Sequence, residues 1–590
     1  MQSGCNLERD PLLEQDSSSF PTAAGLFVAA LAGLVYFNAL DNPFVYDDHR
    51  VVVHNFTIRQ LSDLATILFG DVTRPVVNLS YALDYAIWGA TPFGFHVTNV
   101  WLHVLNTLLL HRLTLRLIQD AKRCGLEVNA AIRPRVAAFV AASLFAVHPV
   151  MTEAVGYISG RSELLCAVFV FSALLSARHW FLKGGAAWWL LTIVFWAGAL
   201  GSKELAVMFP FVLLLYDRLV LPADAATRRR RLVRLHAAVV GLAFAAGGVR
   251  LLVLLFIERP ASVPLESSLF LVNLDVLRRY LALVLVPTAQ AIFHAVPPTT
   301  LQHPRALGAI GTAATVAWVA WSSRRAHGGV SLGLWWFLLM LVPSAMLVML
   351  DRGEPMAEHR IYLACGGLFM AIGVGAAWLH ARFWTIHLHT FELSAKIAFS
   401  VILLSLGTRT VVRNAVWGTE IGLWEEARDL APDHWLPHLM LGQVWESAGD
   451  GRNAEREYTE ALRLRPEEEL IYRKLGVTLI SLERYQEASA LFERLHQRSP
   501  QSATPSLGRA AIAMARQDIQ GARTHLLAAL AWDGVNVEAR QSLAMLAETE
   551  PANPDEALRM CREIHEIAPR TPGNDECIAR NTARLTNSLR

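Results

Sequence analysis

Long apolar segments alternate with short polar connections over the first 412 residues of the chain. A helix needs about 20 mostly apolar residues to cross the hydrocarbon core of a bilayer. The pattern therefore predicts an all-α fold that begins with a polytopic membrane bundle of about 11 spans. The predicted spans are residues 20–40, 93–117, 136–149, 163–182, 187–201, 204–220, 236–257, 305–322, 331–350, 361–379 and 396–412.

Basic residues in three connections set the predicted orientation, because such connections face the cytoplasm under the positive-inside rule. They are Arg112, Arg116, Lys122, Arg123, Arg133 and Arg135, then Arg228 to Arg231 with Arg234, then Arg324 and Arg325. Residues 1–19 become a cytoplasmic disordered tail, and the loop after the first span lies on the far side. That side is the periplasm for a bacterial inner membrane, or the lumen for the endoplasmic reticulum. The apolar patch at 264–292 is predicted to be interfacial or re-entrant. A full span there would place Arg324 and Arg325 on the side away from the cytoplasm, against the positive-inside rule.

A period of 34 residues begins after the last predicted span, where the composition becomes charged and helix-favouring. Small residues at helix contacts and proline after each second helix, repeated at this period, are typical of tetratricopeptide repeats. We expect a membrane domain at 20–412, a junction with a partial repeat at 413–434, four repeats at 435–570 and a capping helix at 571–590. The periodic positions are Ala454, Ala488 and Ala522, and Pro432, Pro466 and Pro500.

An odd number of spans places the repeats on the same side as the loop after the first span. The concave face of such a solenoid is either a passive scaffold or, more often, a docking surface for a protein or peptide. Cys561 and Cys577 flank the turn around Pro569 to Pro572, so an antiparallel helix pair could bring them level. They could form a disulfide if the compartment is oxidising.

The composition supports a membrane protein and argues against two other classes. The chain is 53% hydrophobic and 18% charged, with a mean hydropathy of +0.34, whereas soluble domains carry about a quarter charged residues. A formal net charge of +2 gives no basis for binding nucleic acid. The six cysteines form no CxxC pair, which argues against a zinc site built on cysteine.

Five polar motifs lie on the predicted far side, and most of them adjoin the end of an apolar run. Charged residues this close to hydrocarbon are costly unless they pair with one another or bind something. An ion-pair network holding helices together is one explanation, but the convergence of five loops favours a polar active-site cavity. The motifs are Asp47-Asp48, Arg74-Pro75, the tract HPVMTEAVGYISGRSELL from His148 to Leu165, Ser202-Lys203-Glu204, and AEHRIYLA from Ala357 to Ala364.

The adjacent acids Asp47 and Asp48 have two interpretations. Each raises the cost of ionising the other, so the pair is either a solvated turn or a catalytic or metal-binding site facing a lipid-borne substrate. In the span at 93–117, four polar residues lie on one stripe: His96, Asn99, His103 and Asn106. Hydrogen bonding between helices explains this stripe better than a metal site does. Similarly, His148 precedes Pro149 and could simply cap a short helix.

Several motifs together resemble one family over nearly the whole chain after residue 20. The motifs are FVYDDHRVVVHN, TRPVVNLSYALDYAIWG, GFHVTNVWLHVLN, FAVHPVMTEAVGYISGRSELL, GSKELAV, AEHRIYLA and RNAVWGTEIGLWEEA. They are similar to those of the transmembrane and tetratricopeptide-repeat-containing proteins, which are GT-C glycosyltransferases linked to protein O-mannosylation. The family often has ERYLY where this chain has EHRIY, which leaves the role of His359 open. The short repeat array suggests a bacterial relative.

The resemblance implies an inverting transfer of a hexose, most simply mannose, from a polyprenyl-phosphate sugar to a hydroxyl of a protein acceptor. A carboxylate would accept the proton of the attacking hydroxyl, and cations would neutralise the departing phosphate. We expect Asp47 to be the base and Asp48 to orient it or bind a divalent metal, whose participation the sequence does not decide. Expected phosphate-binding residues are Arg161, Lys203 and Arg360, with Arg74 next. Expected sugar or acceptor contacts are Glu153, Glu163, Glu204, Glu358, His148 and His359.

Three other functions remain open at this point. A transporter with a regulatory repeat domain would place ionisable residues near the bilayer midplane and often show inverted repeats. A non-enzymatic membrane anchor displaying the repeats would not need the acidic pair, GRSELL and EHR together. A third possibility keeps the GT-C chemistry but uses a glycan or lipid acceptor.

Overall fold

The computed structural model describes residues 23–70, 72–124, 133–221, 223–253, 267–349, 354–384, 389–549, 552–568, 571 and 573–588. Every regular element among these residues is a helix, which confirms the predicted all-α class. The chain divides into two compact units, Met1–Leu423 and Trp424–Arg590. The last membrane-type helix continues to Val416, and the division falls within the segment 413–434, which the sequence analysis gave as a junction.

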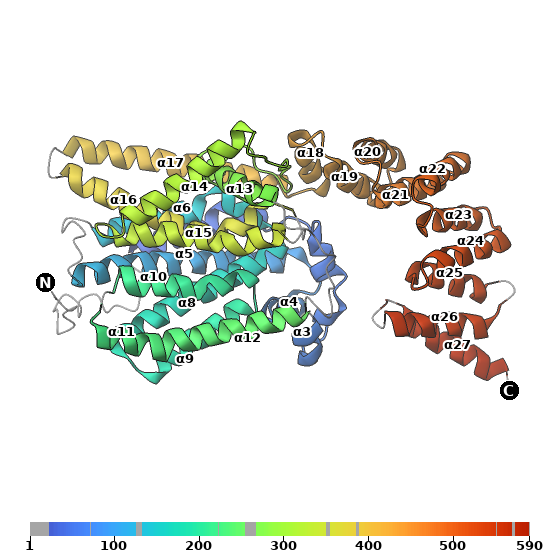
Figure 1. The fold of residues 1–590 in the computed structure, drawn as a ribbon, viewed down its shortest axis with the longest axis horizontal. Coiled ribbons are helices and arrows are strands. Elements are labelled where there is room, and N and C mark those ends of the chain that lie inside the picture. The colour runs from blue at the N-terminus through green and yellow to red at the C-terminus, as the bar shows by residue number, and fades with distance from the viewer. Residues whose placement is uncertain are drawn as a thin grey trace. The chain divides into compact units, whose positions relative to one another are not determined.

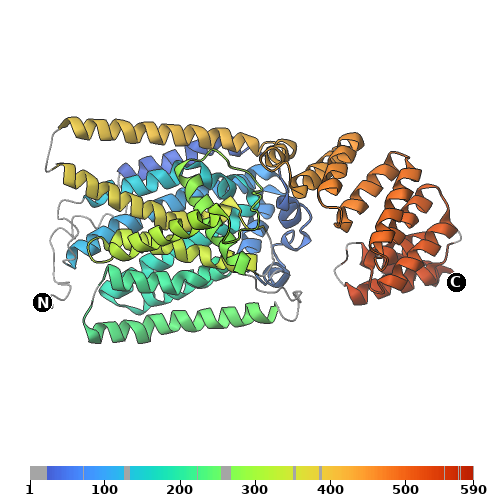
Figure 2. The same cartoon turned by 45° about the horizontal axis from the view of Figure 1, so that its top comes forward.

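The first unit is a bundle of helices lying side by side (Figures 1 and 2). Several begin at a proline, whose fixed φ suits a first helical turn and whose missing N–H costs nothing there. The α-helices are α2 (Ala23–Val35), α3 (Leu64–Gly70), α4 (Pro75–Trp88), α5 (Pro92–Arg123), α6 (Pro134–Val147), α7 (Thr152–Gly156), α8 (Arg161–Lys183), α9 (Ala186–Leu200), α10 (Phe209–Leu219), α11 (Ala225–Arg231), α12 (Ala237–Val253), α13 (Ser267–Leu285), α14 (Pro304–Ser322), α15 (Gly328–Met349), α16 (Tyr362–Trp384) and α17 (His389–Val416). The next helix, α18 (Glu420–Leu430), contains the division between the two units.

Each of the eleven predicted spans contains a helix in the part that the structure describes, but fewer of these helices meet the requirements of a membrane span. In the described residues, five helices are long and apolar enough to cross a membrane, or six if the bent pair α6–α7 counts as one span. The apolar α9, with 15 residues, falls below the length threshold. The 32-residue α5 is long enough, but its polar stripe lowers its hydropathy. The segment at 264–292 contains α13, a 19-residue helix that is not among the five.

The polar stripe of α5 is a packing device, as predicted. His96 Nε2 bonds the carbonyl of Asn42 at 3.0 Å, and His103 Nδ1 bonds Tyr362 Oη at 2.8 Å. Asn106 donates to the carbonyl of Leu164 at 2.9 Å. These side chains are buried, and their bonds join α5 to the segments around it.

Short 3₁₀ and π turns form the connections at one end of the unit, where α3 and α4 lie (Figure 1). They are η1 (Phe37–Ala39), η2 (His49–Val53), η3 (Phe56–Ile58), η4 (Pro149–Met151), η5 (Ile158–Gly160), η6 (Glu204–Met208) and η9 (Glu358–Ile361). The arginine-rich α11 and π-helix η7 (Leu232–His236) lie at the opposite end. The acidic and basic motifs from the predicted far side are thus gathered away from the Arg228 to Arg231 cluster.

The second unit is built of consecutive antiparallel helix pairs. Ala454, Ala488 and Ala522 are buried where paired helices touch, as the repeat predicts. An added Cβ at Gly442 would clash with the ring of Tyr458, so glycine is required where the two helices of the first pair meet. The helices are α19 (Trp435–Ser447), α20 (Gly451–Leu464), α21 (Glu469–Ser481), α22 (Tyr485–Arg498), α23 (Thr504–Ala515), α24 (Ile519–Trp532), α25 (Val537–Glu548), α26 (Pro554–Ile567) and α27 (Asn574–Ser588).

A disulfide joins the last two helices of the second unit. Cys561 on α26 and Cys577 on α27 are bonded, with their Cα atoms 6.3 Å apart. The turn between them includes residues 569, 570 and 572, which lie outside the described part of the chain. The bond ties α27, predicted as a capping helix, to the final repeat.

Candidate active site

The loop that carries the acidic pair is held in an unusual conformation. Tyr46 has φ of 50°, a left-handed value that is uncommon for a residue other than glycine. Its N–H donates to Glu420 Oε1 at 2.9 Å, and the N–H of Asp47 donates to Tyr157 Oη at 3.0 Å. These two bonds fix the backbone at Tyr46 and Asp47. The direction of the Asp47 side chain is therefore set by contacts of the backbone with Glu420 and Tyr157.

Asp47 and Asp48 have different environments despite being neighbours. The Asp47 side chain is 42% exposed and lies 3.4 Å from Arg50 Nε. Asp48 is fully buried. Its Oδ1 accepts hydrogen bonds from the N–H and Oγ of Ser159, both at 2.8 Å, and its Oδ2 accepts from Val45 N–H at 3.2 Å. Burial raises the pKa of Asp48 to about 7, although these hydrogen bonds oppose the shift.

A cavity of about 490 Å³ opens beside Asp47. It is lined by side chains from the loop at 46–51, the start of α4, the segment from α7 to α8, the start of η6 and the segment around η9. Seven residues predicted from the sequence line it: Asp47, Arg74, Glu153, Lys203, Glu204, His359 and Arg360. Asp47 and Arg360, which are more than 300 positions apart in the chain, therefore share one hollow.

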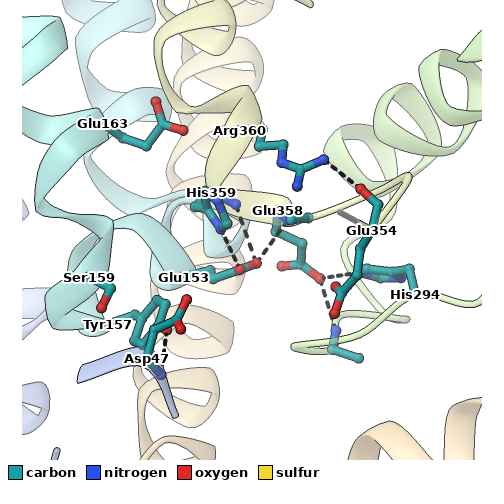
Figure 3. A network of polar contacts seen from close by, with 12 residues as sticks. Asp47, Glu153, Tyr157, Ser159, Glu163, His294, Glu354, Glu358, His359 and Arg360 are labelled. Atoms are coloured by element: carbon teal, nitrogen blue, oxygen red, sulfur yellow. Dashed lines mark hydrogen bonds and ion pairs between the residues drawn. The ribbon is translucent and has the colours of Figure 1, made fainter. Parts of the chain in front are cut away.

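Four cations contribute to the cavity wall: Arg50, which lies beside Asp47, and Arg74, Lys203 and Arg360. Arg74 lies 3.8 Å from Glu204 Oε2, and both side chains are more than a third exposed, so the pair is weak. Lys203 Nζ pairs with Glu163 at 2.5 Å. Arg360 Nη1 donates to the carbonyl oxygen of Glu354 at 2.6 Å (Figure 3). The positive groups line a cavity whose wall also contains carboxylates, which suits a ligand carrying both phosphate and hydroxyl groups.

Two of the predicted acids brace the segment that carries Arg360. Glu153 Oε1 bonds His359 Nδ1 at 2.6 Å, and Oε2 accepts the backbone N–H of Glu358 at 2.8 Å. Glu358 in turn accepts from Gln290 and from the backbone N–H of Ala291, and its Oε1 lies 2.9 Å from His294 Nε2 (Figure 3). His359 is therefore bonded to Glu153. The carboxylate of Glu358 is bonded to Gln290, Ala291 and His294, so its role is to hold these segments together.

Arg161, expected to contact phosphate, lies outside the cavity lining. It is fully buried. It forms an ion pair with Asp84, and it donates to Asn99 Oδ1 at 2.8 Å and to the carbonyl of Phe95 at 2.7 Å. With its guanidinium committed to these groups, Arg161 holds α4, α5 and α8 together.

His148 and Glu163 also lie outside the lining. His148 Nδ1 accepts from the N–H of Val150, which makes it the cap of η4, and Nε2 bonds the carbonyl of Val284 at 2.9 Å. The structure therefore favours the capping interpretation of His148. Glu163 is buried and meets the cavity only through its ion pair with Lys203.

Several lining residues were not anticipated from the sequence. Tyr46, Tyr157 and Ser159 lie inside motifs that the sequence highlighted, but their roles depend on backbone geometry that no motif encodes. Nothing in the sequence pointed to Glu354 as a site residue, since it lies outside every motif quoted above. Burial and the neighbouring carboxylate of Glu153 raise the pKa of Glu354 to about 7.

A metal ion finds no ready ligand set here. Within the described ranges, no group of three or more His, Cys, Asp and Glu side chains could hold a metal ion. Asp48, for which the sequence left open an orienting and a metal-binding role, directs both oxygens at N–H and O–H donors. The donors around Asp48 therefore fit the orienting role better than the metal-binding role.

The fold and the cavity together define a class: a membrane protein with a polar cavity at one end of its helical bundle, followed by tetratricopeptide-type helix pairs. No protein-family model matches the chain. It is 25% identical over 464 residues to protein O-mannosyl-transferase F38B6.6 of Caenorhabditis elegans, covering 75% of this chain and 62% of the relative. It is 24% identical over 546 residues to protein O-mannosyl-transferase Tmtc3 of Drosophila melanogaster, covering 79% and 58%.

A shorter stretch of 192 residues is 33% identical to Tmtc1 of Drosophila melanogaster, which covers 30% of this chain and 21% of that protein. These relatives confirm the resemblance to the transmembrane and tetratricopeptide-repeat-containing proteins. The chain spans less than two thirds of the length of each. Among solved structures, the tetratricopeptide protein YrrB is 17% identical, with a TM-score of 0.21 and coverage of 30% of this chain and 88% of YrrB. A score this low defines no shared fold.

Proposed function

We propose that this protein is a GT-C-type glycosyltransferase that moves mannose from a polyprenyl-phosphate donor to a hydroxyl of a protein acceptor. The observation that carries the proposal is the single cavity in which Asp47 meets Arg74, Lys203 and Arg360. The names of the similar proteins support mannose as the sugar and a protein as the acceptor. The donor and the mechanism are inferred from the chemistry of the lining groups.

Asp47 is the proposed base. The acceptor oxygen attacks the anomeric carbon from the face opposite the phosphate, and its proton passes to the Asp47 carboxylate. The bond between the anomeric carbon and the phosphate oxygen breaks, polyprenyl phosphate leaves, and the anomeric configuration is inverted. Asp48, clamped to Ser159 and Val45, positions the loop and does not touch the substrate.

The cations are proposed to bind the donor phosphate, whose charge grows as the bond to the sugar breaks. Arg74, Lys203 and Arg360 all line the cavity, and positive groups placed in advance stabilise that charge without reorganising. Arg161 is reassigned to positioning because its guanidinium is already occupied. The lipid tail would lie in the bilayer, with the cavity on the periplasmic or lumenal side.

The repeats are proposed to dock the protein acceptor, while the cavity recognises the donor. Deleting residues 435–590 should therefore lower acceptor use and leave donor binding intact. A transporter is the second candidate class, but the acids and cations gather at the end of the bundle where α3 and α4 lie (Figure 1) and not halfway along it.

The proposal is tested by transfer of labelled mannose from polyprenyl-phosphate mannose in membranes that contain the full chain. Asp47→Asn should abolish transfer, with at least a ~1,000-fold loss, while the protein remains folded. Asp41→Asn is the matched control, because Asp41 is exposed on the same loop and does not line the cavity. Unchanged turnover in Asp47→Asn would rule out this residue as the base.

A further inference from the structure

Glu354 differs from the other acids of the cavity wall in lacking a side-chain partner. Across the described part of the chain, no hydrogen bond or ion pair involves its carboxylate, although its backbone carbonyl is bonded to Arg360. The remaining lining acids are paired, Asp47 with Arg50, Glu153 with His359 and Glu204 with Arg74. A mostly buried carboxyl group without a partner is costly to maintain unless a ligand completes it.

The position of Glu354 indicates which part of a ligand it would meet. Arg360 Nη1 holds the carbonyl oxygen of Glu354 at 2.6 Å, so the carboxyl group and the guanidinium belong to neighbouring parts of one wall (Figure 3). In a polyprenyl-phosphate sugar, the hexose is attached directly to the phosphate. A group beside a phosphate-binding arginine is therefore within reach of the first sugar ring.

We propose that Glu354 binds hydroxyl groups of the donor hexose and thereby distinguishes sugar-bearing lipid phosphate from the lipid phosphate that leaves. This inference rests on the proposed function and assigns to Glu354 the recognition of the donor sugar. A carboxylate can accept hydrogen bonds from two adjacent hydroxyls, and a protonated carboxyl can accept one and donate one. The pKa of about 7 makes both forms available near neutral pH.

The test measures the binding of two ligands to the full chain in detergent: polyprenyl-phosphate mannose and the same polyprenyl phosphate without sugar. Glu354→Ala should weaken binding of the sugar-bearing lipid ~10- to 100-fold, as expected for losing hydrogen bonds to a charged group. Binding of the sugar-free lipid should change less than twofold. Glu354→Gln keeps an acceptor oxygen and should lose less affinity than Glu354→Ala.

Glu467→Ala is the control, because Glu467 is 68% exposed on the repeat unit and far from the cavity in sequence. Equal weakening of both lipids, no weakening of either, or a Gln variant as poor as the Ala variant would overturn the assignment. Failure of the proposed function has a separate signature. In that case the wild-type chain binds the sugar-bearing lipid but transfers no mannose to protein, whatever residue occupies position 354.

Discussion

Two groups of buried charges in the first unit use the same residue types in opposite ways. Near α11, the Arg178 guanidinium forms two hydrogen bonds with Asp120, at 2.5 and 2.6 Å, and Tyr216 Oη donates to the same carboxylate at 2.8 Å. Arg231 pairs with Asp217 at 2.5 Å in the same region. In the cavity, by contrast, Arg74 and Glu204 are 3.8 Å apart, and the carboxylate of Glu354 has no hydrogen bond or ion pair among the residues that the structure describes.

The comparison teaches that a charge inside a helical bundle does not by itself indicate a functional site. In the Asp120–Arg178 pair, both carboxylate oxygens of Asp120 accept hydrogen bonds from Arg178, and one also accepts from Tyr216. We call such a pair closed, because its hydrogen-bonding groups are satisfied within the protein. The cavity residues keep hydrogen-bonding capacity directed at an empty space of about 490 Å³. Unused capacity beside a hollow separates a binding site from a structural ion pair.

Breaking the closed pair should have the largest effect. Arg178→Ala leaves Asp120 buried without its partner, and we expect a loss of about 3–5 kcal/mol in the free energy of unfolding. Thermal unfolding in detergent measures this loss. The triple variant Asp120→Leu, Arg178→Met and Tyr216→Phe removes the whole polar group and should recover most of the stability. A triple variant as unstable as Arg178→Ala would show that the region has another role.

Removing a cavity cation should affect activity and leave stability unchanged. Arg74→Ala breaks only a partly exposed pair, so the free energy of unfolding should change by less than about 1 kcal/mol. The KM for polyprenyl-phosphate mannose should rise ~10- to 100-fold, because one phosphate contact is lost. Arg305→Ala, on an exposed position of α14, is the control. A KM like that of the wild type would remove Arg74 from the phosphate site.

Loosening the loop without touching its charge should have a smaller effect. Tyr157→Phe deletes the hydroxyl that accepts the Asp47 N–H and leaves the ring contact with Trp417, at 5.2 Å between centroids. We expect kcat to fall about tenfold with little change in KM for the donor, since the base is misplaced but binding groups remain. A change confined to KM would contradict a positioning role for Tyr157.

Asp48 is expected to cause a pH dependence of the free energy of unfolding. Its pKa is about 7 in the folded state, against 3.8 for an ordinary aspartate. Between these values the folded state retains a proton that the unfolded state has lost, so stability should decrease as pH rises from about 4 to 7 and then level off. Asp48→Asn should lack this decrease. Parallel stability profiles for the two proteins would show that Asp48 does not titrate in this range.

The sequence predicted the periodic features of the fold well, because period and composition are local properties. The 34-residue repeat placed Ala454, Ala488 and Ala522 at buried contacts between helices, as the structure has them. The α5 stripe was likewise assigned to packing. Of the eleven predicted spans, five or six are long and apolar enough within the described residues, since a helix such as α9 resembles a span in its apolar pattern but falls below the required length.

The candidate site was predictable only as a set of motifs. Asp47 and Asp48 look equivalent in the sequence, and only the positions of Ser159 and Tyr157 separate the exposed acid from the buried one. Arg161 belongs to a conspicuous motif, but its partner Asp84 does not, so its burial could not be foreseen. Glu354 was missed because tertiary structure alone brings it to the cavity.

The bond between Tyr46 and Glu420 limits how the protein can be shortened for experiments. Glu420 lies 374 positions after Tyr46, beyond the end of α17 at Val416. Trp417, which stacks near Tyr157, lies in the same stretch. A fragment ending at residue 412 would contain every helix of the bundle that the sequence marks as apolar, and would keep the bond from Asp47 to Tyr157. It would lack Glu420, which holds Tyr46, and Trp417, whose ring packs on that of Tyr157. Inactivity of such a fragment would therefore report a released loop and not a missing acceptor surface.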